Sequence, residues 1–453
     1  MKKTLIAVAA AAALTATSAF AEITFGAWLR SITGVASNGE DIVTGTSNSW
    51  GGIRPSRLNV AGTSEDGNAG FKLDVYFNAT KAQTVNADGT FGGSTQVLEV
   101  GDNAYIWVKP ASSVQLALGK FDVGETGLRG DLCYGSWNWL RPGNWIAEDE
   151  GLTFNGSHTD GLMAKITPVD GLVAVIQLPV YNGTWGGYNN AYQKETVIGG
   201  EKIDSKYTIE DTFKNGMYAA AYSIEGLGTL KAGYFGSYAE HKKGETTREY
   251  LLANGQKDGK WVLKSDSSAE PEWKYNSDTY TKDSKQIGTV NVAFDFNAVE
   301  NLFVTVGARF GIADKEYKAD NEKIKFTAGA SYQVSDAMKF SVSGGYVQYQ
   351  DKCVGKDSDK KDNAFSVGAG VDYAIMDGLN AAADLRYKNI GYGKDKDEGA
   401  ISFLVGVTKN VSSNGYIGVG FQGATNGNGL TGITANKNDD FVWAVPVALS
   451  VWF

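Results

Sequence analysis

The feature that most constrains this chain is a repeated alternation of apolar and polar residues over residues 322–453. The run KIKFTAGASYQV is followed by the turn SDAM and the run KFSVSGGYVQY, and a second unit of the same design begins at Asn363. Alternation with period two gives a strand one apolar face and one polar face. Runs of about ten such residues, separated by turns, are typical of a β-barrel that spans an outer membrane.

Similar pairs of runs extend back to the start of the chain, so we predict an all-β fold, a transmembrane antiparallel β-barrel. Eight hairpins with one further strand at each end predict about 18 strands, with about 16 as the alternative. An even number lets the first and last strands pair antiparallel and leaves no free edge. Short and long connections alternate, which predicts short periplasmic turns and long outer loops.

The first residues predict export. Lys2 and Lys3 precede an apolar run from Leu5 to Leu14, and Ala19-Phe20-Ala21 supplies a small-residue cleavage site. We therefore expect residues 1–21 to be a cleaved signal peptide and residues 22–453 to form the barrel. No later stretch reaches the ~20 consecutive apolar residues of a membrane helix. This predicts a multi-pass protein of the bacterial outer membrane.

Composition and charge narrow the function. The chain holds 57 Gly, 22 Tyr, 20 Phe and 11 Trp but only 7 Pro, which suits strands, turns and interfacial aromatic belts. The net charge of −9 becomes −11 without Lys2 and Lys3, so nucleic acid is not an expected partner. Only His158 and His241 could serve as histidine bases, and no Cys/His spacing suits a metal. We predict no enzyme, no cofactor and no metal.

The side of the wall that each charged residue faces follows from the cost of burying charge in lipid. An Arg or Lys at mid-depth on the lipid face costs about 2–4 kcal/mol, so the charged face of each strand should line the lumen. By this alternation Arg309 opposes Val306, and Arg386 opposes Leu385, and we expect both arginines at the pore constriction. A lumen with such a lining should hold water.

Two stretches resemble the general bacterial porins. SRLNVAGTSEDGNAGFKLDVYF is similar to their second and third strands, and DNAYIWVKPASSVQLALGKFDVG to the fourth and fifth. The resemblance implies that Arg57 and Lys120 belong to a basic cluster on the barrel wall. The extra hairpin Ala400–Ala424 departs from the sixteen-strand pattern and is similar to maltoporin-like and substrate-selective porins. That departure puts non-selective permeation in doubt.

The resemblance also implies that the loop at about residues 122–160 folds into the barrel and narrows it. Its acidic residues could face the basic wall, and its tryptophans either pack against the wall or stack sugars. A solvated loop end is the alternative for the acids. The loop residues assigned to the constriction are Asp131, Glu148, Asp149, Glu150, Trp137, Trp139 and Trp145. Cys133 and Cys353 both fall in outer loops, where they form either one disulfide or two free thiols.

The predicted function is a porin, a water-filled channel for passive diffusion of ions and small hydrophilic solutes, with possible selectivity for sugars or small charged nutrients. A surface-exposed barrel that acts mainly as an adhesin is the alternative. The expected partners are these solutes, outer-membrane lipid and the barrel-insertion machinery, which would recognise the closing strand that ends at Phe453. The sequence leaves open a homotrimer or a monomer, and the identity of the solute.

Overall fold

The computed structural model describes most of the regular strands and leaves several connections undescribed. The described residues are 22–46, 56–77, 84–85, 91–92, 98–126, 128, 160–179, 193–198, 201–206, 209–247, 256–257, 260–261, 277–313, 322–349, 363–389, 399–426 and 440–453. Among them, no helix is both long enough and apolar enough to cross a membrane.

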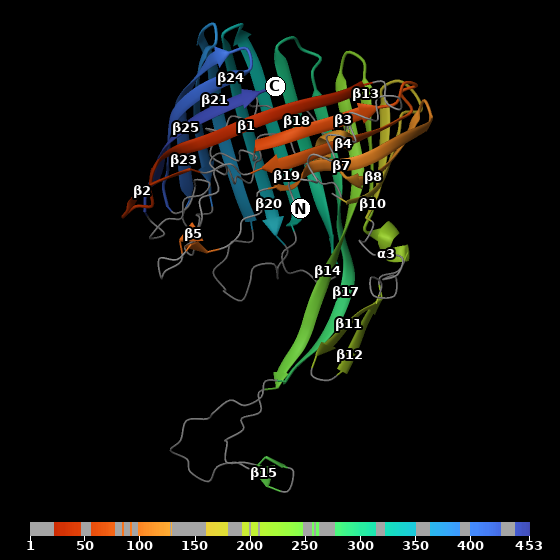
Figure 1. The fold of residues 1–453 in the computed structure, drawn as a ribbon. Helices are drawn as coiled ribbons and strands as arrows, with labels where there is room; N and C mark the ends of the chain where they lie inside the picture. The colour runs from red at the N-terminus through yellow and green to blue at the C-terminus, as the bar shows by residue number, and fades with distance from the viewer. Residues whose placement is uncertain are drawn as a thin grey trace, which may run out of the picture.

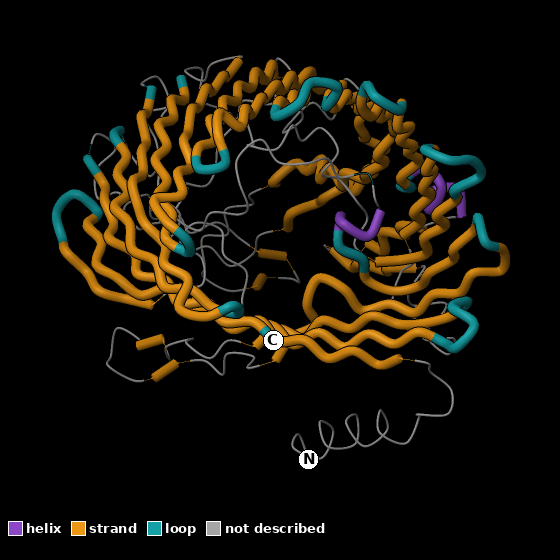
Figure 2. Tube along the Cα trace, turned by 90° about the horizontal axis from the view of Figure 1, so that it is seen from above, coloured by secondary structure: helices purple, strands orange, loops and turns teal. Residues whose placement is uncertain are grey.

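The main sheet is a closed antiparallel barrel, which confirms the predicted fold class (Figures 1 and 2). The sheet holds 19 strands, of which β2 (Ile42–Thr46) pairs only with the far end of β1, so 18 strands form the wall. These 18 are β1 Glu22–Ser37, β3 Ser56–Thr63, β4 Ala69–Phe77, β7 Leu98–Ala111, β8 Val114–Lys120, β9 Asp160–Ile166, β10 Leu172–Pro179, β13 Met217–Ile224, β14 Gly228–Thr247, β17 Ser277–Phe296, β18 Leu302–Ala313, β19 Glu322–Ser335, β20 Met338–Tyr349, β21 Asn363–Met376, β22 Leu379–Lys388, β23 Ala400–Ser412, β24 Gly415–Ala424 and β25 Val442–Trp452.

The barrel closes where its first strand meets its last. β1 pairs with β25 from Trp28–Trp452 to Ser37–Trp443, while the earlier residues of β1 pair with β3. Phe453 extends this seam, since its amide donates to the Ala27 carbonyl at 2.9 Å and its carbonyl accepts from the Ala27 amide at 3.1 Å. Every strand of the wall therefore has two neighbours.

The wall strands are joined at one end by eight short turns, as the sequence predicts. Several of these turns need glycine: Gly226 and Gly378, for example, have φ of 69° and 67°, in the left-handed region that other residues rarely adopt. The longer connections leave from the opposite end. They carry the small hairpins β5–β6 (Thr84–Val85 and Phe91–Gly92), β11–β12 (Gln193–Ile198 and Glu201–Lys206) and β15–β16 (Gln256–Lys257 and Lys260–Trp261), together with η2 (Val123–Thr126) and α3 (Ile209–Lys214).

One hairpin is longer than the sequence predicts. The alternation of apolar and polar residues predicts strands over Thr229–Ala239 and Ile287–Asn297, but β14 and β17 pair along 20 residues each, from Gly228–Phe296 to Thr247–Ser277. They extend well beyond the wall as a two-stranded ribbon (Figure 1). Residues 240–286 are mostly polar. The missed extension lacks an apolar face and therefore gives no alternation to detect.

Candidate functional site: the inner wall

The two faces of the wall differ in chemistry, and alternation along each strand decides which residue faces which way. On β22, Leu385 is 59% exposed on the outside while its neighbour Arg386 is 4% exposed on the inside. On β18, Val306 and Phe310 are exposed outside, and Arg309 alternates with them. The outer face thus offers apolar side chains and the inner face polar ones, as an outer-membrane barrel requires.

A basic cluster lies on the inner wall beside the seam. The guanidinium groups of Arg30 on β1 and Arg57 on β3 both lie over the indole ring of Trp28, the latter with its Cζ 5.2 Å from the ring centroid. The Trp28 indole N–H donates to Ser450 Oγ at 2.7 Å, which fixes the ring against β25. Arg57 Nη1 lies 3.9 Å from Asp102. The cluster therefore holds two positive charges on one aromatic platform.

A buried amide and carboxylate network continues this inner surface along β3, β4 and β7. Asp74 is fully buried, and each of its carboxylate oxygens accepts a hydrogen bond, from Asn59 Nδ2 at 2.6 Å and from Asn103 Nδ2 at 2.8 Å. Asn103 Oδ1 in turn accepts from the Asp122 amide at 2.9 Å. Satisfied networks of this kind fix side chains in one arrangement. We call the inner face of β1, β3, β4 and β7 the charged arc.

The chain after β8 turns into the barrel. Both Phe121 and Leu128 are almost completely buried, and the Phe121 ring lies 5.0 Å from the inward Tyr105 ring. Between them, η2 brings the Glu125 carboxylate to Lys72 Nζ and to the Tyr105 hydroxyl, which donates at 2.7 Å. The described start of the loop, residues 121–126 and 128, therefore lies against the inner wall.

The inner wall on the other side of the barrel carries mainly glycine and serine. These residues alternate with exposed apolar side chains such as Val342 and Val367. We call the inner face of β19, β20, β21, β23 and β24 the small-residue arc. Its members are Gly329, Ser331, Ser341, Ser343, Gly345, Ser366, Gly368, Gly370, Ser402, Gly406, Gly418 and Gly420.

Basic residues border the small-residue arc. Arg309 on β18 is in register with Lys325 on β19, and both share the inner face. On β22, Arg386 Nη2 lies 3.5 Å from Asp384 Oδ2, and both side chains are buried. Positive charge therefore lies on this part of the inner wall as well as at the basic cluster, and Asp384 balances the charge of Arg386.

The predicted site residues are placed as follows. The alternation puts Arg57, Arg309 and Arg386 on the inner face. Lys120 differs from the expectation: it shares the outward side of β8 with the exposed Leu116 and Leu118, so the structure does not bring it to the basic cluster. Asp131, Cys133, Trp137, Trp139, Trp145, Glu148, Asp149, Glu150 and Cys353 lie outside the described residues.

Three inner-wall residues were missed by the sequence reasoning: Trp28, Arg30 and Glu125. Alternation with the apolar Phe25, Ala27 and Leu29 would have put Trp28 and Arg30 on the inner face. Nothing in the sequence indicated that the chain at Glu125 returns to Lys72.

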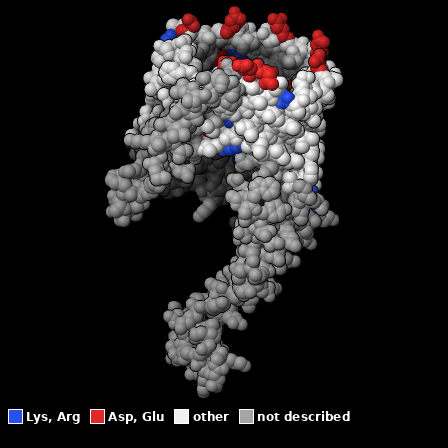
Figure 3. Space-filling view, turned by 45° about the vertical axis from the view of Figure 1, so that its right-hand side comes forward, with Lys and Arg blue, Asp and Glu red and all other residues white. Residues whose placement is uncertain are grey.

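Carboxylates gather at the short-turn end of the barrel, where Figure 3 shows them along the rim. Their side chains are exposed, as expected for turns in water. In the turn between β3 and β4, hydrogen bonds from Ser64 and then from Asn68 lower the pKa of Asp66 below its ordinary value of 3.8. The exposed acids of the turns are Glu65, Asp66, Asp170, Glu225, Glu300, Asp336 and Asp377.

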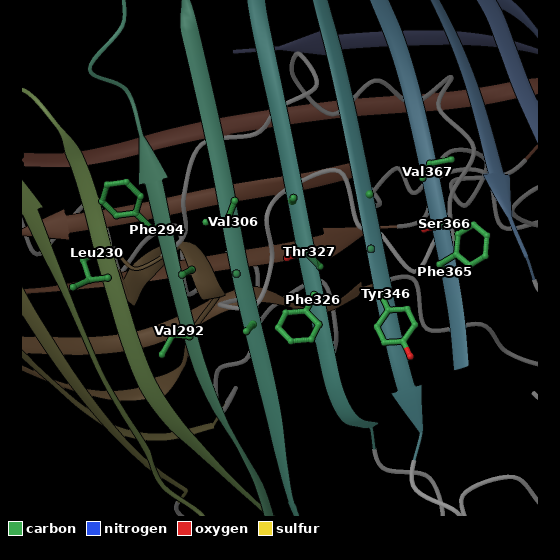
Figure 4. A pocket seen from close by; sticks show the side chains of 16 residues that line it. Leu230, Val292, Phe294, Val306, Phe326, Thr327, Tyr346, Phe365, Ser366 and Val367 are labelled. Atoms are coloured by element: carbon green, nitrogen blue, oxygen red, sulfur yellow. The ribbon is translucent and has the colours of Figure 1, made fainter. Parts of the chain in front are cut away.

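A groove of about 690 Å³ lies on the outer face (Figure 4). Phe294, Val306, Phe326, Tyr346 and Phe365 line it from five neighbouring strands. All five belong to the outward-facing set of their strands, so the groove opens away from the lumen and does not belong to the inner-wall site. Its apolar lining suits hydrocarbon.

The profile of the family described as "Outer membrane protein beta-barrel domain" matches residues 267–408, about a third of the chain. No curated protein sequence matches the chain. Over residues 267–408 the chain thus resembles outer-membrane β-barrel proteins.

Three solved structures are similar in overall arrangement. The anion-selective porin from Comamonas acidovorans shows 14% identity and a TM-score of 0.45, covering 95% of this chain and 99% of its own. The outer membrane channel DcaP of Acinetobacter baumannii shows 11% identity and a TM-score of 0.42, covering 95% of this chain and 97% of its own. The trimer form of OmpT from Vibrio cholerae shows 13% identity and a TM-score of 0.40, covering 95% of this chain and 99% of its own. Scores below 0.5 add nothing to the barrel assignment, which depends on the strand register of this chain.

Proposed function

We propose that this protein is a porin-like channel of the bacterial outer membrane, through which ions and small hydrophilic solutes diffuse passively. The observation that carries the proposal is the closed 18-strand wall with apolar side chains outside and polar or small ones inside. Such a wall is stable in lipid because no backbone group is left without a partner. Its polar inner face retains water, which is what passing solutes need.

The inner wall favours anionic solutes in this proposal. The cluster of Arg30 and Arg57 on Trp28 concentrates positive charge on a narrow part of the wall. Arg309 and Lys325 add a second positive region on neighbouring strands. Two unit charges 4 Å apart interact by about 1 kcal/mol in water and about 4 kcal/mol near a protein surface. Small carboxylates and phosphates would therefore be enriched beside the wall.

The loop at about residues 122–160 forms the constriction in this proposal. The position of its first residues against the inner wall supports it. Glu148, Asp149 and Glu150 would then oppose the basic wall, and Trp137, Trp139 and Trp145 would narrow the opening by packing or by stacking sugars. Current block by sugars, lost when the three tryptophans become Ala, would identify stacking. Unchanged conductance in that variant would place these residues outside the channel.

Export and insertion complete the proposal. Residues 1–21 would be removed on export, and the closing strand would be recognised by the insertion machinery. Phe453 suits this role because its side chain is 73% exposed on the outer face while its backbone completes the seam. Deletion of Phe453 should lower the amount of protein in the outer membrane. Normal insertion of the truncated chain would contradict this part.

An adhesin role is the second candidate, favoured by the ribbon of β14 and β17 that extends beyond the wall. Deleting residues 240–286 separates the two roles. A channel keeps its conductance without the ribbon, whereas an adhesin loses binding to its target surface.

Purified protein in a planar bilayer tests the main proposal. Stepwise currents with an anion-favouring reversal potential are expected. Absence of any current from correctly folded, heat-modifiable barrels would overturn it. Sugars and organic acids tested as blockers would then identify the solute class, and cross-linking before electrophoresis would distinguish a homotrimer from a monomer.

A further inference from the structure

The start of the loop after β8 is held to the wall by more than chain connectivity. β8 ends at Lys120, and the next residues bend inward instead of continuing along the barrel. The Asp122 amide donates to Asn103 Oδ1 at 2.9 Å, and Phe121 packs on Tyr105. These contacts place η2 beside β4 and β7.

Glu125 uses both of its carboxylate oxygens to join η2 to two strands. Oε1 pairs with Lys72 Nζ on β4, and Oε2 accepts from the Tyr105 hydroxyl on β7 at 2.7 Å. Lys72 and Tyr105 are register partners, so the carboxylate bridges neighbouring positions of the wall. Charge-assisted hydrogen bonds are stronger than neutral ones, and two of them to one carboxylate fix its orientation.

An apolar patch on the inner wall holds the other side of the same segment. Leu128 packs in a buried cluster that includes Ala117 on β8, Met163 on β9 and Val175 on β10. The Leu128 amide donates to Thr126 Oγ1 at 3.1 Å. The segment is therefore fixed by a polar contact at Glu125 and an apolar contact at Leu128, only three residues apart.

We propose that Glu125 is a latch, a positioning residue that fixes the start of this loop to the inner wall and keeps the open cross-section of the channel constant. The second half of this statement rests on the proposed channel function. A 3-10 segment of four residues has little stability of its own. Without the bridge, η2 would leave and return to the wall repeatedly, and the cross-section would fluctuate.

The wall contains a matched control for this latch. Lys231 Nζ on β14 pairs with Asp295 Oδ2 on β17, and the Thr305 hydroxyl on β18 donates to Asp295 Oδ1 at 2.7 Å. This cluster has the same chemistry as the latch: one ammonium and one hydroxyl on one carboxylate. It joins only wall strands, so its loss should weaken the wall without releasing the loop.

The first readout is hydrogen exchange of residues 121–128 in folded protein. Glu125→Ala should raise the exchange rates of these amides roughly tenfold or more, the loss expected for a hydrogen bond to a charged group. Amides of β4 and β7 should remain protected, because the wall pairing is intact. Asp295→Ala should leave residues 121–128 unchanged. The exchanged pair Lys72→Glu with Glu125→Lys should restore part of the protection.

The second readout is the open-channel current. Glu125→Ala should raise the open-channel noise several-fold and the exchanged pair should lower it again, while Asp295→Ala should match the wild type. Wild-type exchange at residues 121–128 in Glu125→Ala overturns the latch. An equal rise in Asp295→Ala shows a general loss of wall stability and also overturns it. Increased exchange in a protein that never conducts supports the latch and contradicts the channel.

Discussion

The charged arc and the small-residue arc are parts of one wall with the same strand geometry, yet they present different side chains to the lumen. The first carries large charged and aromatic residues, and the second carries many glycines and serines. On the inner face of the charged arc, Arg30 and Arg57 lie over the Trp28 ring, and Asp74 accepts hydrogen bonds from two asparagine side chains. The small-residue arc presents Gly and Ser such as Ser341 and Gly368, which extend little from the backbone. Side-chain size therefore decides which part of the wall projects toward the lumen and which part leaves room.

The largest effect is expected when an arginine is placed on the outer face or on the inner face of β20, a strand of the small-residue arc. The two substitutions should differ in their effect on the free energy of unfolding. Val342→Arg places charge on the lipid face of β20 and should lower the free energy of unfolding by about 2–4 kcal/mol near mid-depth. Ser343→Arg, a sequence neighbour of Val342 on the inner face whose side chain is only half-buried, should cost far less because the guanidinium can reach water. Unfolding in liposomes by denaturant measures both. Equal losses would mean that the small-residue arc is not open to water.

The next effect tests the charge of the charged arc. Replacing Arg30 and Arg57 by Gln should lower the anion-to-cation permeability ratio by about an order of magnitude, because each charge contributes about 1–4 kcal/mol at close range. Reversal potentials under a salt gradient measure the ratio. The effect should weaken in ~1 M salt, where the Debye length is about 3 Å. Lys120→Gln is the control, because its side chain faces outward, and a shift equal to that of the arginines would contradict this placement.

The smallest effect is expected in the short turns at the rim. There the pH dependence of stability should differ between a turn of the charged arc and a turn of the small-residue arc. The pKa of Asp66 is lowered by its hydrogen bonds to Ser64 and Asn68. Its contribution to stability is therefore present above the ordinary pKa of 3.8 and is lost as the pH falls through the folded value. Asp66→Asn should flatten the acid limb of the unfolding profile slightly between about pH 5 and 2. Asp336→Asn, in the turn of the small-residue arc, is the comparison, and identical profiles for wild type and Asp66→Asn would refute the expectation.

Alternation in the sequence predicts the faces of this wall because the side of each strand that faces lipid must carry apolar side chains. It therefore places Arg309 and Arg386 inside, and it also contains the information for Arg30. The family resemblance and the alternation disagree at Lys120, and the structure agrees with the alternation. The latch is different in kind, since Glu125 and Lys72 are 53 residues apart and meet only after the wall has formed. No local pattern encodes such a contact.

The seam has a consequence for the order of events when this chain is made. The hydrogen bond from Trp28 to Ser450 joins residues 422 positions apart, and β25, which pairs with β1 at the seam, follows all the other wall strands in the chain. Until they arrive, both edges of the growing sheet can pair with other chains, the usual route to aggregation. Contacts so distant in sequence also form slowly, because a long loop must close first. Pairing of β1 with β25 is thus the step that ends the risk of aggregation. Protection of the chain before that step matters as much as the stability of the finished barrel.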